Sequence, residues 1–237
     1  WNVCLGNSTA IKAMSTGTMC ATAFVGDGSG LTGIAAGGAF KCIATKNFVT
    51  DNTCSGCNIS SGGTGNIVAG ECAGKCLTTA CDSIFLGQYA GKSVQTARAN
   101  ILLGYKVGCS ITSGNYNVHL GFGNGSAQTG TGAFNISLGT DTAENLSSGA
   151  SNILMCTAKA KSGTVTGSRN IAMGCRTAYC LTSGSDNILL GLYAGCKQQG
   201  VSESIFIGKY AGCCWNNDDS SILIGSEAGL KMSGGGK

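Results

Sequence analysis

A short phrase, Asn-Ile-x-Leu-Gly in its fullest form, returns ten times at intervals of 17 or 18 residues and spans more than two thirds of the 237-residue chain. A unit this short cannot bury its own apolar residues, so regular copies indicate that each unit stacks on the next around a shared core. We therefore expect a solenoid. The apolar residues that anchor the successive copies are Ile67, Ile84, Ile101, Val118, Ile136, Ile153, Ile171, Ile188, Ile205 and Ile222.

The composition favours β-structure with many tight turns. The chain has 40 glycines and no proline, with 15 Lys and Arg against 11 Asp and Glu. Glycine at this frequency would suggest disorder in a polar chain, but here the apolar residues are plentiful and periodic. The expected fold class is all-β, a parallel β-solenoid or β-roll of about ten coils of 17 to 18 residues each.

The distribution of charged and apolar residues argues against two kinds of partner, nucleic acid and a membrane. The formal net charge of +4 is spread along the chain without a run of basic residues, so we expect no nucleic-acid binding. No stretch reaches the roughly 18 consecutive apolar residues that a membrane span requires, so we expect no membrane insertion.

Each copy predicts a three-residue strand whose middle position is apolar. Strand side chains alternate, so the first and third residues share one face and the middle residue occupies the other. Eight of the ten middle residues are apolar, and a strand that is apolar on both faces is buried on both. We expect one face to line the coil and the middle residues to be covered by sister chains, because an exposed stripe of this size exceeds the few hundred Å² usual for a monomer.

Symmetric closure is the usual way to bury identical stripes, and three parallel solenoids around one axis would bring three copies of each middle residue together. The sequence thus predicts a homotrimer. His119, the only histidine, would form a ring of three imidazoles able to hold a metal or an anion, although a packed neutral histidine is the alternative. The predicted interface residues are Phe85, Leu102, His119, Leu154, Leu189, Phe206 and Leu223.

Glycine and asparagine predict the corners of each coil. Glycine directly follows nine of the ten strand triplets, and Cys156 replaces it once. A turn with positive φ, or a close backbone approach, would favour glycine there. Asn precedes most triplets, with Ser at Ser83, Ser204 and Ser221, and short polar side chains that bond to neighbouring backbone suit such a corner.

Two motifs carry a resemblance to known families. Residues Asn187 to Gly195 (Asn-Ile-Leu-Leu-Gly-Leu-Tyr-Ala-Gly) resemble the head repeats of YadA-like trimeric autotransporter adhesins and similar repeats of bacteriophage tail fibres. Residues Phe24 to Gly33 (Phe-Val-Gly-Asp-Gly-Ser-Gly-Leu-Thr-Gly) are similar to an element that recurs in phage tail-fibre proteins, notably those of marine phages. The resemblance implies a left-handed parallel β-roll, three chains around an axis, and adhesion to a host surface. The repeats here are longer than the roughly 14-residue unit usual in the adhesins.

These patterns divide the chain into four expected segments. Residues 1–40 form a glycine-rich fibre junction, residues 41–65 a transition or capping segment, residues 66–229 the solenoid repeats, and residues 230–237 a flexible tail.

The fifteen cysteines allow two kinds of chemistry. Cys196 and Cys213 occupy the same repeat position one coil apart, as does Cys109 further back, and a spacing of about 4.8 Å between coils permits a disulfide. Free thiols are the favoured alternative for a protein assembled in a reducing cytosol. A zinc cluster is the second possibility, weighed against thiols that pack as small apolar groups. Its candidate ligands are Cys54, Cys57, Cys72, Cys76 and Cys81.

The function that these features predict is attachment rather than catalysis. One histidine and eleven scattered carboxylates offer no constellation of acid, base and nucleophile, so we expect no enzyme and no cofactor. Aromatic side chains on the outer turns suit stacking on sugars, with packing as the alternative role. The candidate sugar-binding residues are Tyr89, Tyr193, Tyr210 and Trp215.

We therefore expect the shaft or receptor-binding segment of a virion tail fibre. Its partners would be two sister chains, other tail or baseplate proteins, and a host-surface glycan or receptor. The alternatives are a cellular trimeric adhesin head and a self-assembling extracellular β-solenoid filament, which would place the chain at a cell surface or outside the cell.

Overall fold

The computed structural model describes residues 40–43, 47–50, 54–59, 62–125, 131–155, 166–197, 199–214 and 219–230. All regular structure in these residues is β-strand, as the composition predicts. The expected junction at 1–40 and tail at 230–237 lie outside the described residues, except for Phe40 and Leu230.

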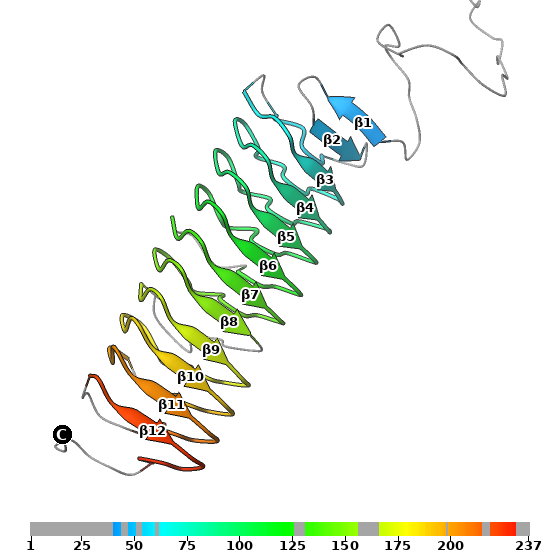
Figure 1. The fold of residues 1–237 in the computed structure, drawn as a ribbon. Helices are drawn as coiled ribbons and strands as arrows, with labels where there is room; N and C mark the ends of the chain where they lie inside the picture. The colour runs from blue at the N-terminus through cyan, green and yellow to red at the C-terminus, as the bar shows by residue number, and fades with distance from the viewer. Residues whose placement is uncertain are drawn as a thin grey trace, which may run out of the picture. The chain divides into compact units, whose positions relative to one another are not determined.

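The described strands form one sheet in which every strand pairs with the next along the chain (Figure 1). The first pair is antiparallel, and the strands from β2 to β12 are all parallel to one another. Parallel pairing of strands only three residues long, each 17 or 18 residues after the last, is the arrangement of a β-solenoid. The strands are β1 (Phe40–Ile43), β2 (Asn47–Thr50), β3 (Ile67–Ala69), β4 (Ile84–Leu86), β5 (Ile101–Leu103), β6 (Val118–Leu120), β7 (Ile136–Leu138), β8 (Ile153–Met155), β9 (Ile171–Met173), β10 (Ile188–Leu190), β11 (Ile205–Ile207) and β12 (Ile222–Ile224).

The repeat phrase sets the register of the sheet. Each of the ten anchor residues opens a strand from β3 to β12, and equivalent residues pair across coils, as Ile188 does with Ile205. The expected solenoid is confirmed. It begins one strand earlier than predicted, because Phe48 and Val49 of β2 pair in parallel with Ile67 and Val68. The segment assigned to transition or capping thus contains both a coil strand and the antiparallel β1.

The interior of each coil receives one side chain from the strand and several from the turns. Phe85, for example, packs in one apolar cluster with Ala90 and Val94 from the turn that follows it. A second cluster includes Leu189, Phe206 and Ala211 further along the solenoid. Among the described residues between these two clusters, the buried side chains are polar: Asn117, His119, Asn124, Asn135, Ser137 and Thr142.

A ladder of buried asparagines joins successive coils just before the strands. Asn152 is representative: its backbone N–H and its Nδ2 both donate to Oδ1 of Asn135, at 2.9 and 3.1 Å. Its Nδ2 also donates to the Gly167 carbonyl at 3.0 Å, while its Oδ1 accepts from the backbone of Asn170. Each amide therefore satisfies backbone groups that would otherwise be buried without partners, which explains why a short polar residue opens each phrase.

Glycine is required where each strand ends, for both of the predicted reasons. Gly104 has a φ of 126°, and a Cβ there would overlap the carbonyl oxygen of Gly121 in the next coil. Gly87, Gly121 and Gly191 show the same positive φ and the same close approach to the glycine one coil further on. The coils therefore stack backbone against backbone at this corner. Cys156, which breaks the series, lies outside the described residues.

Candidate functional site

The residues predicted to form a trimer interface line the inside of the coil instead. Phe85, Leu102, His119 and Phe206 have no exposed surface in the single chain, and Leu154 and Leu189 are also buried. Leu223, in the last strand, packs against the second core cluster. The assignment of the first six residues to sister-chain contacts is wrong, because the turns of their own coil already cover them, whereas Leu223 is only partly buried.

The opposite face of the strands is the exposed one. Its side chains form two columns, one from the first residue of each strand and one from the third, both almost entirely large and aliphatic. Many are half-buried by their neighbours in the stack, and Ile67, Leu86, Ile136 and Met173 retain 37 to 40% of their accessible surface. We call this surface the aliphatic face; it runs along the strands from β3 to β12.

A second surface lies on the turn that follows each strand. The second residue after the strand-ending glycine is in the left-handed region, with φ of 62° at Tyr89, 54° at Lys106 and 57° at both Tyr193 and Tyr210. This conformation recurs from coil to coil, so it belongs to the geometry of the roll. Aromatic and basic side chains gather at this turn; we call the surface the aromatic edge.

The first group on the aromatic edge contains Tyr89, Tyr105 and Phe122. The ring of Tyr89 meets that of Tyr105 edge to face, with centroids 6.2 Å apart. Tyr105 stacks on Phe122 at 5.0 Å. The ammonium of Lys92 lies 5.5 Å from the centroid of the Tyr89 ring, and that of Lys106 lies 5.2 Å from the Tyr105 centroid. Tyr105 and Phe122 were missed by the sequence argument because they stand one residue before the tyrosines of the full repeat phrase.

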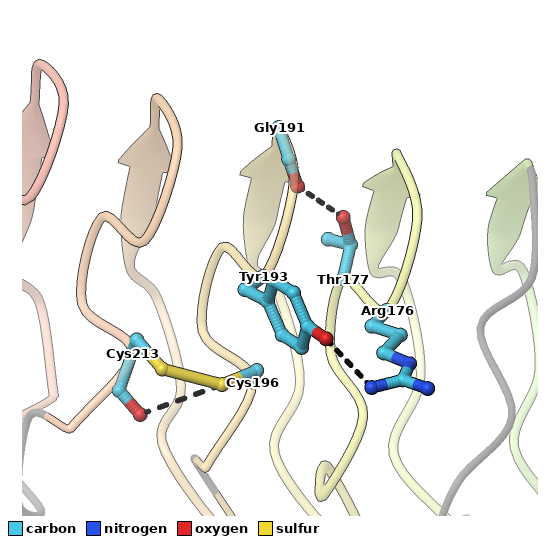
Figure 2. Close-up of a disulfide and its surroundings, with 6 residues drawn as sticks. All are labelled: Arg176, Thr177, Gly191, Tyr193, Cys196 and Cys213. Carbon is cyan, nitrogen blue, oxygen red and sulfur yellow. Dashed lines mark hydrogen bonds between the residues drawn. A yellow bond between two sulfur atoms is a disulfide. The ribbon is translucent and has the colours of Figure 1, made fainter.

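The second group contains Tyr193 and Tyr210, stacked with centroids 5.0 Å apart. Nη1 of Arg176 donates a hydrogen bond of 2.6 Å to the Tyr193 hydroxyl (Figure 2), and its guanidinium lies 5.5 Å from the ring centroid. Lys209 lies 5.5 Å from the ring of Tyr210. The structure thus places Tyr89, Tyr193 and Tyr210 on one edge, whereas Trp215 lies outside the described residues.

Cys196 and Cys213 form a disulfide between adjacent coils, with Cα atoms 4.8 Å apart (Figure 2). The predicted spacing is confirmed, and the preference for free thiols is wrong for this pair. The zinc hypothesis gains no support: within the described residues no three His, Cys, Asp or Glu side chains gather closely enough to hold a metal. Burial and the neighbouring Cys54 raise the pKa of the Cys57 thiol, which disfavours the thiolate that zinc would need.

His119 is enclosed within its own coil, so three copies cannot converge on an axis to hold a metal. Its Nδ1 is hydrogen-bonded to the hydroxyl of Ser137, which donates at 2.6 Å to Oδ1 of Asn124. Its Nε2 has no hydrogen-bond partner among the described residues. Burial lowers its pKa to about 4, so the packed neutral imidazole is the form present near neutral pH.

Comparison of the chain with protein-family models, with curated proteins and with solved structures found no match in any of the three. The fold therefore defines the class: this is a β-solenoid repeat protein with 17- to 18-residue coils. The described residues include no helix with the length and apolarity needed to cross a membrane.

Proposed function

We propose that the chain is a structural segment of a virion tail fibre that associates as a homotrimer and mediates attachment to a host surface. The observation that carries the proposal is the aliphatic face, which remains partly exposed along ten consecutive strands of a single chain. The fibre assignment itself rests on the resemblance of the repeats and of residues Phe24 to Gly33 to phage tail-fibre elements.

The size of the aliphatic face supports association with further copies. Ten strands spaced about 4.8 Å apart, with two columns of side chains, present on the order of 500 to 600 Å². That lies at the upper end of the roughly 300 to 600 Å² that the largest apolar patch of a typical monomer covers, and such patches often mark interaction sites. Each chain of a standard stable interface buries about 800 Å², so the face together with its margins approaches the area that a stable assembly needs.

A three-fold axis parallel to the stack suits the arrangement of the two columns. The first-residue column of one chain would meet the third-residue column of the next, and this contact repeats three times and closes the ring. Every coil would then contribute the same contact, because equivalent residues lie in register from strand to strand. The trimer proposed here is thus built on residues such as Ile136 and Leu86, not on the middle residues.

The other surfaces fit a role outside the cell that depends on contact alone. The Cys196–Cys213 disulfide suits an oxidising exterior, where such bonds persist. The aromatic edge lies on the turns beyond the aliphatic face and would remain accessible in the trimer. We infer that the fibre acts by presenting these turns to a surface and contacts tail or baseplate proteins elsewhere.

The oligomeric state of the full chain tests the proposal. Sedimentation equilibrium should give three times the chain mass of 23.6 kDa. Ile136→Lys places a charge at the centre of the aliphatic face and should yield a monomer with an unchanged far-ultraviolet circular dichroism spectrum, because Ile136 contributes no side chain to the coil interior.

Phe134→Lys is the matched control, since Phe134 is exposed on a different turn, stacked on Tyr116. This variant should remain a trimer. A monomeric wild type, a dimer, an open-ended filament, or dissociation of both variants would contradict the proposed trimer.

A further inference from the structure

The first group on the aromatic edge encloses a pocket. Tyr89, Lys92, Tyr105, Lys106 and Cys109 line a space of about 350 Å³ that is open to solvent. This volume lies at the lower end of the range for small-molecule sites, which suits one or two sugar rings. All five residues belong to the turns after β4 and β5, so stacked coils hold them in register.

The lining combines two features, flat aromatic rings and nearby cations. Tyrosine rings offer flat apolar surfaces with a hydroxyl at the rim, which suit the C–H face and hydroxyls of a pyranose. Lys92 and Lys106 are exposed and hold their ammonium groups within 5.5 Å of those rings. A ligand that stacks on the tyrosines therefore brings any acidic substituent beside two cations.

The surrounding charges also favour an anion. Lys75, one coil before Lys92, occupies the same repeat position. Glu71, on the preceding turn, accepts a 2.5 Å hydrogen bond from Nε2 of Gln88. The turns directly after β3, β4 and β5 therefore hold three lysines against the single carboxylate of Glu71, a local excess of positive charge.

We propose that Tyr89, Lys92, Tyr105 and Lys106 form a binding site for an acidic saccharide, a pyranose that bears a carboxylate or a sulfate. This inference rests on the attachment role proposed above and names the chemistry of the surface that the fibre would recognise.

Single-stranded nucleic acid is the rival ligand, since it too combines rings with negative charge. It is disfavoured because its bases need a file of open aromatic faces. Here the rings of Tyr89 and Tyr105 meet at an interplanar angle of 74°, so they do not form such a file for consecutive bases.

The second group on the aromatic edge repeats the same chemistry. Tyr193 and Tyr210 stack beside Arg176 and Lys209, and this group follows β9 to β11. Tyr105 follows β5 and Tyr193 follows β10, so the two groups lie five strand spacings apart along the stack, or about 24 Å. A polymer of acidic sugars could engage both groups at once, which would raise its apparent affinity without any new contact.

Isothermal titration calorimetry on the full chain at low salt tests the site with defined probes. A polygalacturonate octasaccharide supplies carboxylates, a heparin-derived octasaccharide supplies sulfates, a dextran octasaccharide is the neutral control, and a thymidine octanucleotide represents nucleic acid. We expect at least one acidic saccharide to bind measurably and the neutral one to bind at least about tenfold more weakly.

Variants assign the binding to the pocket. The double variant Lys92→Gln/Lys106→Gln should weaken acidic-saccharide binding by about fivefold to tenfold, and Tyr105→Leu by about fivefold. Arg98→Gln, which removes an exposed charge from the segment before β5, should leave the affinity within about twofold. Circular dichroism spectra that match the wild type would show that the fold persists.

Several results would overturn the inference: no binding of either acidic probe, equal binding of the dextran, affinity unaffected by the double lysine variant, or tighter binding of the oligonucleotide. These results leave the trimer measurement untouched, so a failed saccharide site and a failed fibre assembly are distinguishable.

Discussion

Ile84 and Phe85 are adjacent residues with opposite surroundings. Phe85 is fully buried inside the coil, whereas Ile84 lies on the aliphatic face and is partly exposed. In the monomeric Ile136→Lys background, we expect Phe85→Ala to lower the free energy of unfolding by about 3 to 5 kcal/mol, because it leaves a cavity. Ile84→Ala should cost less than about 1.5 kcal/mol. Urea unfolding measures both, and equal losses would contradict the inward placement of Phe85.

Both faces of each strand are apolar, which is why the middle residues were predicted to lie on the wrong one. Side-chain alternation told us that Phe85 and Ile84 face opposite ways, but both columns are apolar, so hydrophobicity alone does not say which is inside. The deciding signal lies in the turns. Ala90 and Val94 supply apolar side chains that need one strand residue to pack against within a closed coil.

The exposed aromatic residues were only partly predictable. Tyr89, Tyr193 and Tyr210 stand at one position of the repeat phrase, so stacking the copies brings them to one edge. The pairing of Tyr105 with Phe122, and the place of Lys92 beside Tyr89, depend on the turn conformation. The sequence does not reveal that conformation, because the residues that adopt it, such as Cys72, Lys106 and Glu227, differ in type from coil to coil.

Most described coils are held at two corners, by asparagine or serine side chains before the strand and by glycine contacts after it. The strands themselves are three residues long and supply few ladder hydrogen bonds. These corner contacts therefore do much to align each coil with the next. Substitutions there should disturb the stacking of neighbouring coils as well as the local turn.

Two glycines separate the cost of positive φ from the cost of close approach. Gly104 and Gly225 share a φ of 126°, but a Cβ on Gly225 would meet nothing within 4 Å, whereas one on Gly104 would strike the next coil. We expect Gly225→Ala to cost about 1 to 3 kcal/mol from backbone strain alone. Gly104→Ala should cost clearly more, and thermal unfolding should rank them so; equal midpoints would show that stacking tolerates the extra carbon.

The chain as a whole has a core in two apolar parts with a polar layer between them. His119, Asn124 and Ser137 form this layer through hydrogen bonds to one another. In repeat proteins stability passes from coil to coil through neighbouring contacts, so the layer is the place where the two halves are coupled. Its strength depends on the protonation of one side chain.

Protonation of His119 should destabilise the fold. Burial lowers the pKa of His119 to about 4, while an unfolded histidine titrates near 6.5. The neutral form therefore stabilises the fold: the contribution is complete above about pH 6.5 and is lost as the pH falls from 6.5 towards 4. The loss should be on the order of 3 kcal/mol, measured by urea unfolding at pH 7.5 and 4.5.

His119→Leu is the control for this pH dependence. Carboxylates titrate in both proteins, so only the part of the slope due to the imidazole should disappear in the variant. If wild type and variant lose the same stability between the two pH values, His119 is not the group responsible.

The glycine and asparagine ladders have a genetic consequence, because they make one coil interchangeable with the next. Unequal recombination between the repeats would insert or delete whole coils, and each new coil would find its bonding partners already in place above and below. The reach of such a molecule can thus change in steps of about 4.8 Å. A lineage could retune how far its tip extends while inheriting the same interior.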